Sequence, residues 1–76
     1  MSKLVDMLRT SAQADKAKAL LSLELLGNKA VGIGDHSTED FYKNADEALI
    51  MLVDADDRIA TLNKYFNSST GDVING

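Results

Sequence analysis

The chain has 76 residues and a mass of 8.2 kDa, a size that allows a single domain. It contains neither cysteine nor proline, so thiol chemistry is excluded and long helices meet no proline break. The net charge of −4 disfavours a mainly electrostatic grip on nucleic acid, and no stretch approaches the roughly 20 apolar residues of a membrane span. We therefore expect a cytoplasmic domain with an aliphatic core.

The first predicted helix covers residues 2–26, a run of helix-forming residues without glycine. Its apolar stripe consists of Val5, Leu8, Ala12, Ala19, Leu23 and Leu26. Polar residues, among them Asp15, fall near the same stripe, so the face expected to be buried is interrupted midway. Gly27 and Asn28 commonly end helices, and the helix is predicted to stop there.

Residues 27–37 hold three of the five glycines and predict a connection. Gly32 and Gly34 precede a helix, but the segment lacks the ending of a phosphate-binding loop and follows no predicted strand, so we interpret both as turn residues. His36 is the only histidine, and two acidic residues follow within four positions. One histidine with two carboxylates is a weak metal pattern, and we interpret these residues as the start of the next helix.

The second predicted helix covers residues 38–66, and either Ser37 or Thr38 is suited to cap it. Its apolar residues alternate spacings of four and three, the pattern of a helix that packs along another helix. They are Phe41, Ala45, Ala48, Leu52, Ala55, Ile59, Leu62 and Phe66. We expect the alanines to admit a close partner helix, and Leu52, Ile59 and Leu62 to be buried on one face.

Opposite-charge pairs spaced by four residues lie on the other side of this helix and are expected to support it. They are Glu39–Lys43, Lys43–Glu47 and Asp54–Arg58.

The two runs predict an all-α fold, an antiparallel two-helix hairpin that forms one domain over residues 1–66. Residues 67–76 are small and polar and are expected to form a flexible C-terminal tail. A lone hairpin leaves apolar residues such as Leu20 and Leu49 without cover. Residues of the linker or a second copy, in a homodimeric four-helix bundle, would cover them, and the sequence leaves both arrangements open.

No pattern in the sequence predicts catalytic, cofactor-binding or metal-binding residues, and we expect a protein without enzymatic activity. Asp54, Asp56 and Asp57 resemble part of a calcium loop, but Ile59 stands where such a loop needs glycine. We interpret this acidic run as a solvated face, and as part of a surface that a basic partner would recognise.

A surface for a protein partner is predicted on the outer side of the second helix. Ile50 and Val53 lie away from the apolar seam, and Asp46, Asp54 and Asp57 surround them. An apolar centre with a charged rim is typical of protein interfaces. These five residues are the candidate partner-binding residues.

Three segments carry a resemblance to known proteins that extends over residues 14–66. They are VGIGDHSTEDF at 31–41, ADDR at 55–58 and KYF at 64–66. With them the chain resembles small helical proteins of T-even-like phages, in particular the kind encoded next to the recombination helicase UvsW. The resemblance implies an accessory role in phage DNA recombination, repair or replication in the host cytoplasm, acting through a UvsW-type helicase. It supplies no functional residues.

Two further hypotheses place the protein in other functional classes. A small helical regulator that binds nucleic acid would need a basic face from residues 1–26, which sum to a charge of +1, and its binding would depend on salt. A metal-dependent enzyme centred on His36 would bind metal measurably. We prefer the protein-interaction hypothesis to both.

Overall fold

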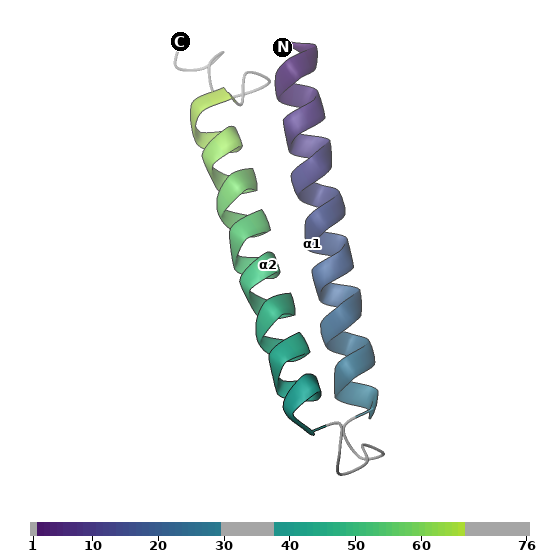
Figure 1. The fold of residues 1–76 in the computed structure, drawn as a ribbon. Coiled ribbons are helices and arrows are strands. Elements are labelled where there is room, and N and C mark those ends of the chain that lie inside the picture. Colours follow the sequence, from purple (N-terminus) through teal and green to yellow (C-terminus); the bar gives the residue numbers. More distant parts are fainter. Residues whose placement is uncertain (1, 30–37, 67–76) are drawn as a thin grey trace.

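The computed structural model describes residues 2–29 and 38–66, which form two α-helices and, within these ranges, no strand. Helix α1 spans Lys3–Lys29 and helix α2 spans Thr38–Phe66. The helices lie side by side and run antiparallel, so α1 begins at the end of the molecule where α2 stops (Figure 1). The all-α antiparallel hairpin predicted from the sequence is confirmed. Neither helix has an apolar stretch long enough to cross a membrane.

The helix ends follow local chemistry. Ser2 caps α1: its Oγ accepts a hydrogen bond from the backbone N–H of Val5 at 3.1 Å. The predicted bounds of α2 are confirmed, but the predicted stop of α1 at Gly27 is wrong, because the helix continues to Lys29. Gly27 does not adopt a positive φ, and one glycine costs about 1 kcal/mol relative to alanine, too little to end a long packed helix.

Several sequence predictions fall on residues outside the described ranges. They concern the cap by Ser37, the turn roles of Gly32 and Gly34, the role of His36 and the tail at 67–76. The cover that the linker would provide lies outside these ranges as well.

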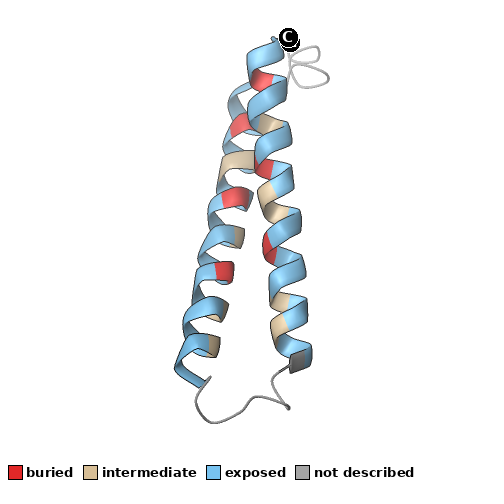
Figure 2. Cartoon of the chain, turned by 45° about the vertical axis from the view of Figure 1, so that its right-hand side comes forward, coloured by how far each residue is buried: buried red, intermediate tan, exposed pale blue. Residues whose placement is uncertain are grey.

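The core is a narrow seam between the helices, in which a buried residue recurs every seven positions (Figure 2). The buried residues are Val5, Ala12 and Ala19 on α1, and Ala48, Ala55 and Leu62 on α2. A repeat of seven is the spacing of long helices that pack at a shallow angle. Because four of the six residues are alanine, the two backbones lie close together, as the sequence predicted.

The larger residues of the predicted seam are only partly covered. Leu62 is buried as expected, but the prediction of full burial for Leu52 and Ile59 is wrong, since both are half-buried. The alternating spacing of four and three creates two columns of residues about 50° apart around the helix. The column of Ala48 and Ala55 points at α1, and the column of Leu52 and Ile59 lies beside the contact.

One flank of the seam is closed by a charged cluster. Nη2 of Arg58 donates a hydrogen bond to Oδ2 of Asp15 at 2.7 Å, and its Nε donates to Oδ2 of Asp54 at 2.9 Å. The hydrogen bond to Asp15, reinforced by Asp54, raises the pKa of Arg58 above its ordinary value. The predicted Asp54–Arg58 pair is confirmed, whereas no ion pair joins Lys43 to a carboxylate in the described ranges. The polar interruption at Asp15 thus has a partner on the other helix.

The opposite flank, here called the ladder flank, carries two further contacts between the helices. Nζ of Lys16 lies 3.1 Å from Oδ1 of Asp56, and Nε of Arg9 donates a hydrogen bond to Oδ1 of Asn63 at 3.2 Å. From one contact to the other, the residue number rises by seven on α1 and falls by seven on α2. The ladder therefore fixes the antiparallel register independently of the alanine seam.

Candidate interaction surface

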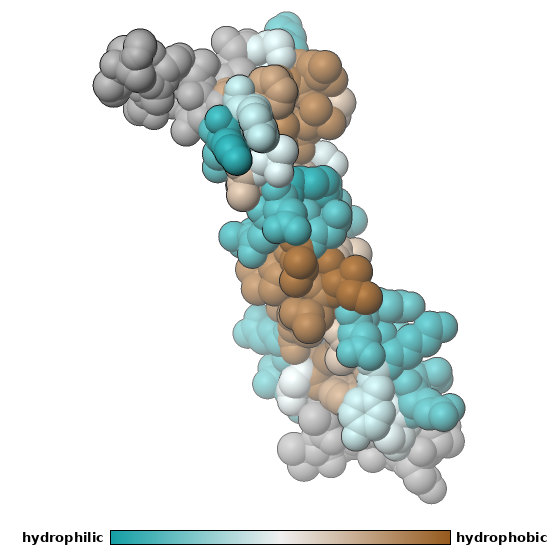
Figure 3. Space-filling model, turned by 90° about the vertical axis from the view of Figure 1, so that its left-hand side faces the viewer, coloured by the Kyte–Doolittle hydropathy of each residue, from teal (hydrophilic) through white to brown (hydrophobic). Residues whose placement is uncertain are grey.

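Four of the five predicted partner-binding residues form one stripe on the outer side of α2. Asp46, Ile50, Val53 and Asp57 are spaced by four, three and four residues, so they lie on the side opposite the alanine seam. All four are exposed, Ile50 by 66% and Val53 by 52% of their surface. Figure 3 shows this side of the molecule, with an apolar region midway along it between two hydrophilic regions. We call these four residues the outer stripe.

The fifth predicted residue, Asp54, lies away from the outer stripe. Its carboxylate accepts the hydrogen bond from Arg58 and so belongs to the charged cluster beside the seam. More than half of the Asp54 side chain is exposed, but its negative charge is paired with Arg58 on the same helix. The structure therefore separates Asp54 from the four residues with which the sequence grouped it.

Neighbouring apolar residues enlarge the exposed surface. Leu49 is exposed beside the outer stripe, and the sequence-based set of partner-binding residues did not include it. Met51 is exposed as well, but on the side of α2 that faces α1. The signal that could have revealed them is the unbroken apolar run 49–53. Because a helix turns once in 3.6 residues, five consecutive apolar residues reach every side of it, and a single neighbouring helix covers one side.

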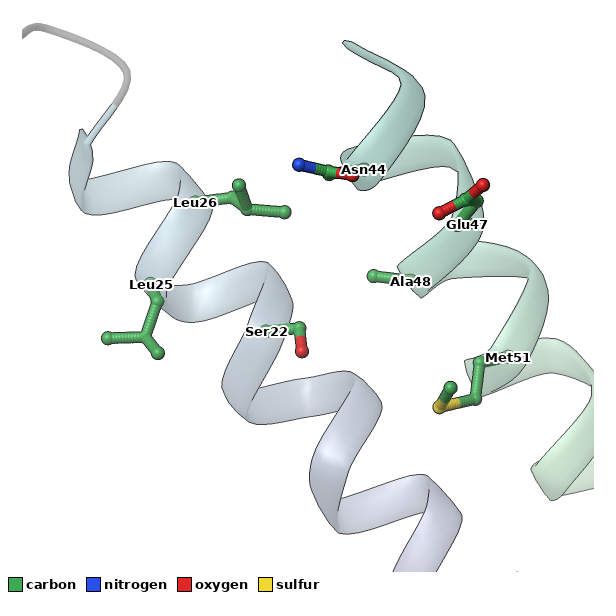
Figure 4. A pocket seen from close by; sticks show the side chains of 7 residues that line it. All are labelled: Ser22, Leu25, Leu26, Asn44, Glu47, Ala48 and Met51. Carbon is green, nitrogen blue, oxygen red and sulfur yellow. The ribbon is translucent and has the colours of Figure 1, made fainter. Parts of the chain in front are cut away.

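A shallow groove of about 380 Å³ lies between the helices at the end of the hairpin where α1 stops (Figure 4). Its lining comes from both helices: Ser22, Leu25, Leu26, Asn44, Glu47, Ala48 and Met51. Leu26 and Ser22 point towards α2, and Ala48 and Met51 point back towards α1. Glu47 is the ionisable residue of this lining, and acid–base chemistry would need a second such group beside it.

Metal binding finds no support within residues 2–29 and 38–66, where no group of three or more His, Asp or Glu side chains is arranged to hold an ion. Asp54 and Asp56 instead contact Arg58 and Lys16. The interpretation of the acidic run as a face rather than a calcium loop agrees with these contacts.

The basic residues of α1 are largely engaged by acidic residues. Three lysine or arginine side chains have a carboxylate oxygen within 4.0 Å, in the pairs Arg9–Asp6, Lys16–Asp56 and Lys18–Asp15. A phosphate backbone is bound by lysine and arginine side chains that are free to replace its counterions. Helix α1 therefore presents a mixed surface rather than a basic one.

Comparisons with known proteins supply no relative: no family model matches the chain, and no curated protein or solved structure is similar to it.

Proposed function

We propose that this protein is a non-enzymatic interaction module whose outer stripe on α2 binds a protein partner. The observation that carries the proposal is the exposure of Ile50 and Val53 between two carboxylates, on a face that the hairpin itself does not use. The partner that we propose is a component of phage DNA recombination, repair or replication, namely a UvsW-type helicase. The choice of helicase rests on the resemblance in residues 14–66.

The arrangement of the outer stripe suits a partner with an apolar groove. Ile50 and Val53 are three positions apart, so their side chains emerge next to each other from a rigid helix. A helix that binds in a groove of another protein commonly inserts apolar side chains with this spacing. Leu49, beside them, adds apolar surface. A preformed helix loses little conformational freedom on binding, which favours affinity.

The rim of the stripe suits a partner with basic surface around that groove. Asp46 lies one turn before Ile50, and Asp57 lies one turn after Val53. With a net charge of −4, the chain attracts positively charged surfaces at long range. A protein that handles DNA offers lysine and arginine side chains for its own ligand, and such charges accelerate association with an acidic surface.

Direct binding of nucleic acid is the less favoured function, for the same electrostatic reason. The pairs of Arg9, Lys16 and Lys18 with carboxylates leave α1 without the free basic face that this hypothesis needs. A DNA backbone would also have to approach a chain of net negative charge. The proposal therefore assigns the contact with DNA to the partner.

The test is a titration of the fluorescently labelled chain with purified UvsW-type helicase, followed by fluorescence anisotropy at low and at moderate salt. We expect binding that weakens with salt, and at least about a tenfold loss of affinity for Ile50→Asp, as for the central residue of an interface. The matched control is Leu21→Asp, because Leu21 is a similarly exposed apolar residue on α1. It should bind like the unmodified chain. Circular dichroism verifies that both variants remain helical.

Two results would contradict the proposal. One is the absence of binding at tens of micromolar helicase in low salt. The other is an equal loss of affinity for Ile50→Asp and Leu21→Asp, which would show that the outer stripe has no special role. Tight, salt-dependent binding of the chain to single-stranded DNA, without binding to the helicase, would support the nucleic-acid hypothesis instead.

A further inference from the structure

The ladder flank carries a strip of large apolar residues that the hairpin covers only in part. Leu23 on α1 and Leu52 and Ile59 on α2 are half-buried. The strip continues into the exposed residues Leu20 and Leu49. Half-burial shows that each side chain packs against the neighbouring helix with one side and leaves the other side open. The strip is therefore the edge of a core that the hairpin does not complete.

The register of the ladder places these residues side by side. The contacts Arg9–Asn63 and Lys16–Asp56 step by seven residues, forwards on α1 and backwards on α2. The next step brings Leu23 beside Leu49, and residues four positions apart on one helix share a side. The ladder flank thus has a polar half near the start of α1 and an apolar half near its end.

We propose that two copies of this chain pack their ladder flanks together into a four-helix bundle, with a two-fold axis parallel to the helices. The ends that carry Asn28 then lie at the same end of the dimer. This orientation sets the apolar half of one copy on the apolar half of the other. It also sets Lys16 of each copy at the height of Asp56 in its partner. This inference names the flank and the orientation and does not depend on the proposed function.

The charges distinguish this orientation from its alternative. With the axis perpendicular to the helices, the apolar half around Leu20 and Leu49 would cover Arg9 and Lys16 of the other copy. Charged groups would then be buried against apolar surface without new partners, which opposes association. In the proposed orientation, Lys16 on α1 of each copy lies opposite Asp56 on α2 of the other copy, reciprocally across the axis.

The charged cluster also favours this flank over the opposite one. On the opposite flank Arg58 bridges Asp15 and Asp54 beside the seam, and Lys18 lies 3.9 Å from Asp15. A second copy placed there would remove water from charges that already have their partners, which is costly. On the ladder flank, Leu23, Leu52 and Ile59 are half-buried and offer apolar surface to a second copy.

The available area fits a stable dimer. A helix of 27 residues is about 40 Å long, and two helices side by side are about 20 Å wide. The flank therefore offers roughly 800 Å² per copy, which is the usual contribution of each partner to a specific interface. The four residues of the outer stripe of α2 lie outside this flank, and Leu49 lies at the border between the two surfaces.

The experiment exploits the absence of cysteine, because a single introduced cysteine becomes the only labelling site. Asn28→Cys labels one end of the hairpin and Lys3→Cys labels the other, and both positions are exposed. Spin labels at either position are measured by double electron–electron resonance, with the mass followed by sedimentation equilibrium. We expect a species of twice the monomer mass and a distance of about 20–30 Å for both labels, comparable to the width of the bundle.

Other results would overturn the inference. A monomeric mass at several hundred micromolar chain would exclude the dimer, and distances of about 40 Å or more for both labels would show the opposite orientation. Ile59→Glu should give a monomer, whereas Leu21→Glu on the outer side of α1 should remain a dimer. If Ile59→Glu fails to fold, Leu20→Glu, at an exposed position of the same flank, should give the monomer instead, and a dimer for this variant would exclude the ladder flank. None of these measurements uses the helicase, so the outcome is independent of the proposed function.

Discussion

The alanine seam makes a sharp prediction about Ala55, which lies at its centre on α2. Both Ala55 and Ala12 on α1 are 0% exposed. In the register of the Lys16–Asp56 contact, Ala55 faces the stretch of α1 between Ala12 and Ala19. Ala55→Leu places an isobutyl group where only a methyl group fits. The added atoms must either force the helices apart or twist side chains from their preferred rotamers.

The expected cost of Ala55→Leu follows from the close packing of the seam. Overpacking a filled core typically costs about 1–3 kcal/mol. A chain of this length is expected to be stable by about 4–11 kcal/mol, so the substitution removes a large fraction of the total. Leucine forms helices nearly as well as alanine, and local propensity therefore contributes little to the change. The predicted loss is a property of the contact between the helices.

Urea denaturation followed by far-UV circular dichroism measures this loss. With a slope of about 1 kcal/mol per molar urea, the midpoint should fall by about 1–3 M. The matched control is Ala60→Leu, the same change at an exposed position of the same helix, which should shift stability by less than about 0.5 kcal/mol. All proteins are compared at one concentration, since the proposed dimer would make stability depend on concentration. Equal midpoints for the two variants would refute the close approach of the helices at Ala55.

Three further stability predictions use the same assay. Leu62→Ala removes the largest buried side chain of α2 and should cost about 2–4 kcal/mol, and a loss below 1 kcal/mol would contradict its burial. Ser2→Ala removes the cap of α1 and should cost about 1 kcal/mol, whereas Ser2→Gly should cost only a few tenths. Gly27→Ala should stabilise the protein by about 0.5–1 kcal/mol, because a Cβ at this helical position meets open space, and a destabilised variant would argue against the helical backbone there.

Local patterns determined a large part of this molecule. The glycine-free run and the alternating apolar spacing predicted α2 with its observed bounds, because both properties act over a few turns of one helix. The same spacing identified the outer stripe, since the side opposite a seam follows from 3.6 residues per turn. The end of α1 was predicted wrongly. Glycine often ends helices, but the free-energy cost of Gly27 inside the helix is small compared with the stabilisation from packing along the whole of α1.

The tertiary structure decided what depends on the partner helix. Of the two apolar columns on α2, only contact with α1 selects the column of Ala48 and Ala55 for burial and leaves Leu52 and Ile59 at the edge. The bond between Asp15 and Arg58 joins residues 43 positions apart, and it removes Asp54 from the predicted interaction surface by drawing the three side chains together. Sequence periodicity defines the faces of one helix, but the face that is covered depends on the position and rotation of a second helix far away along the chain.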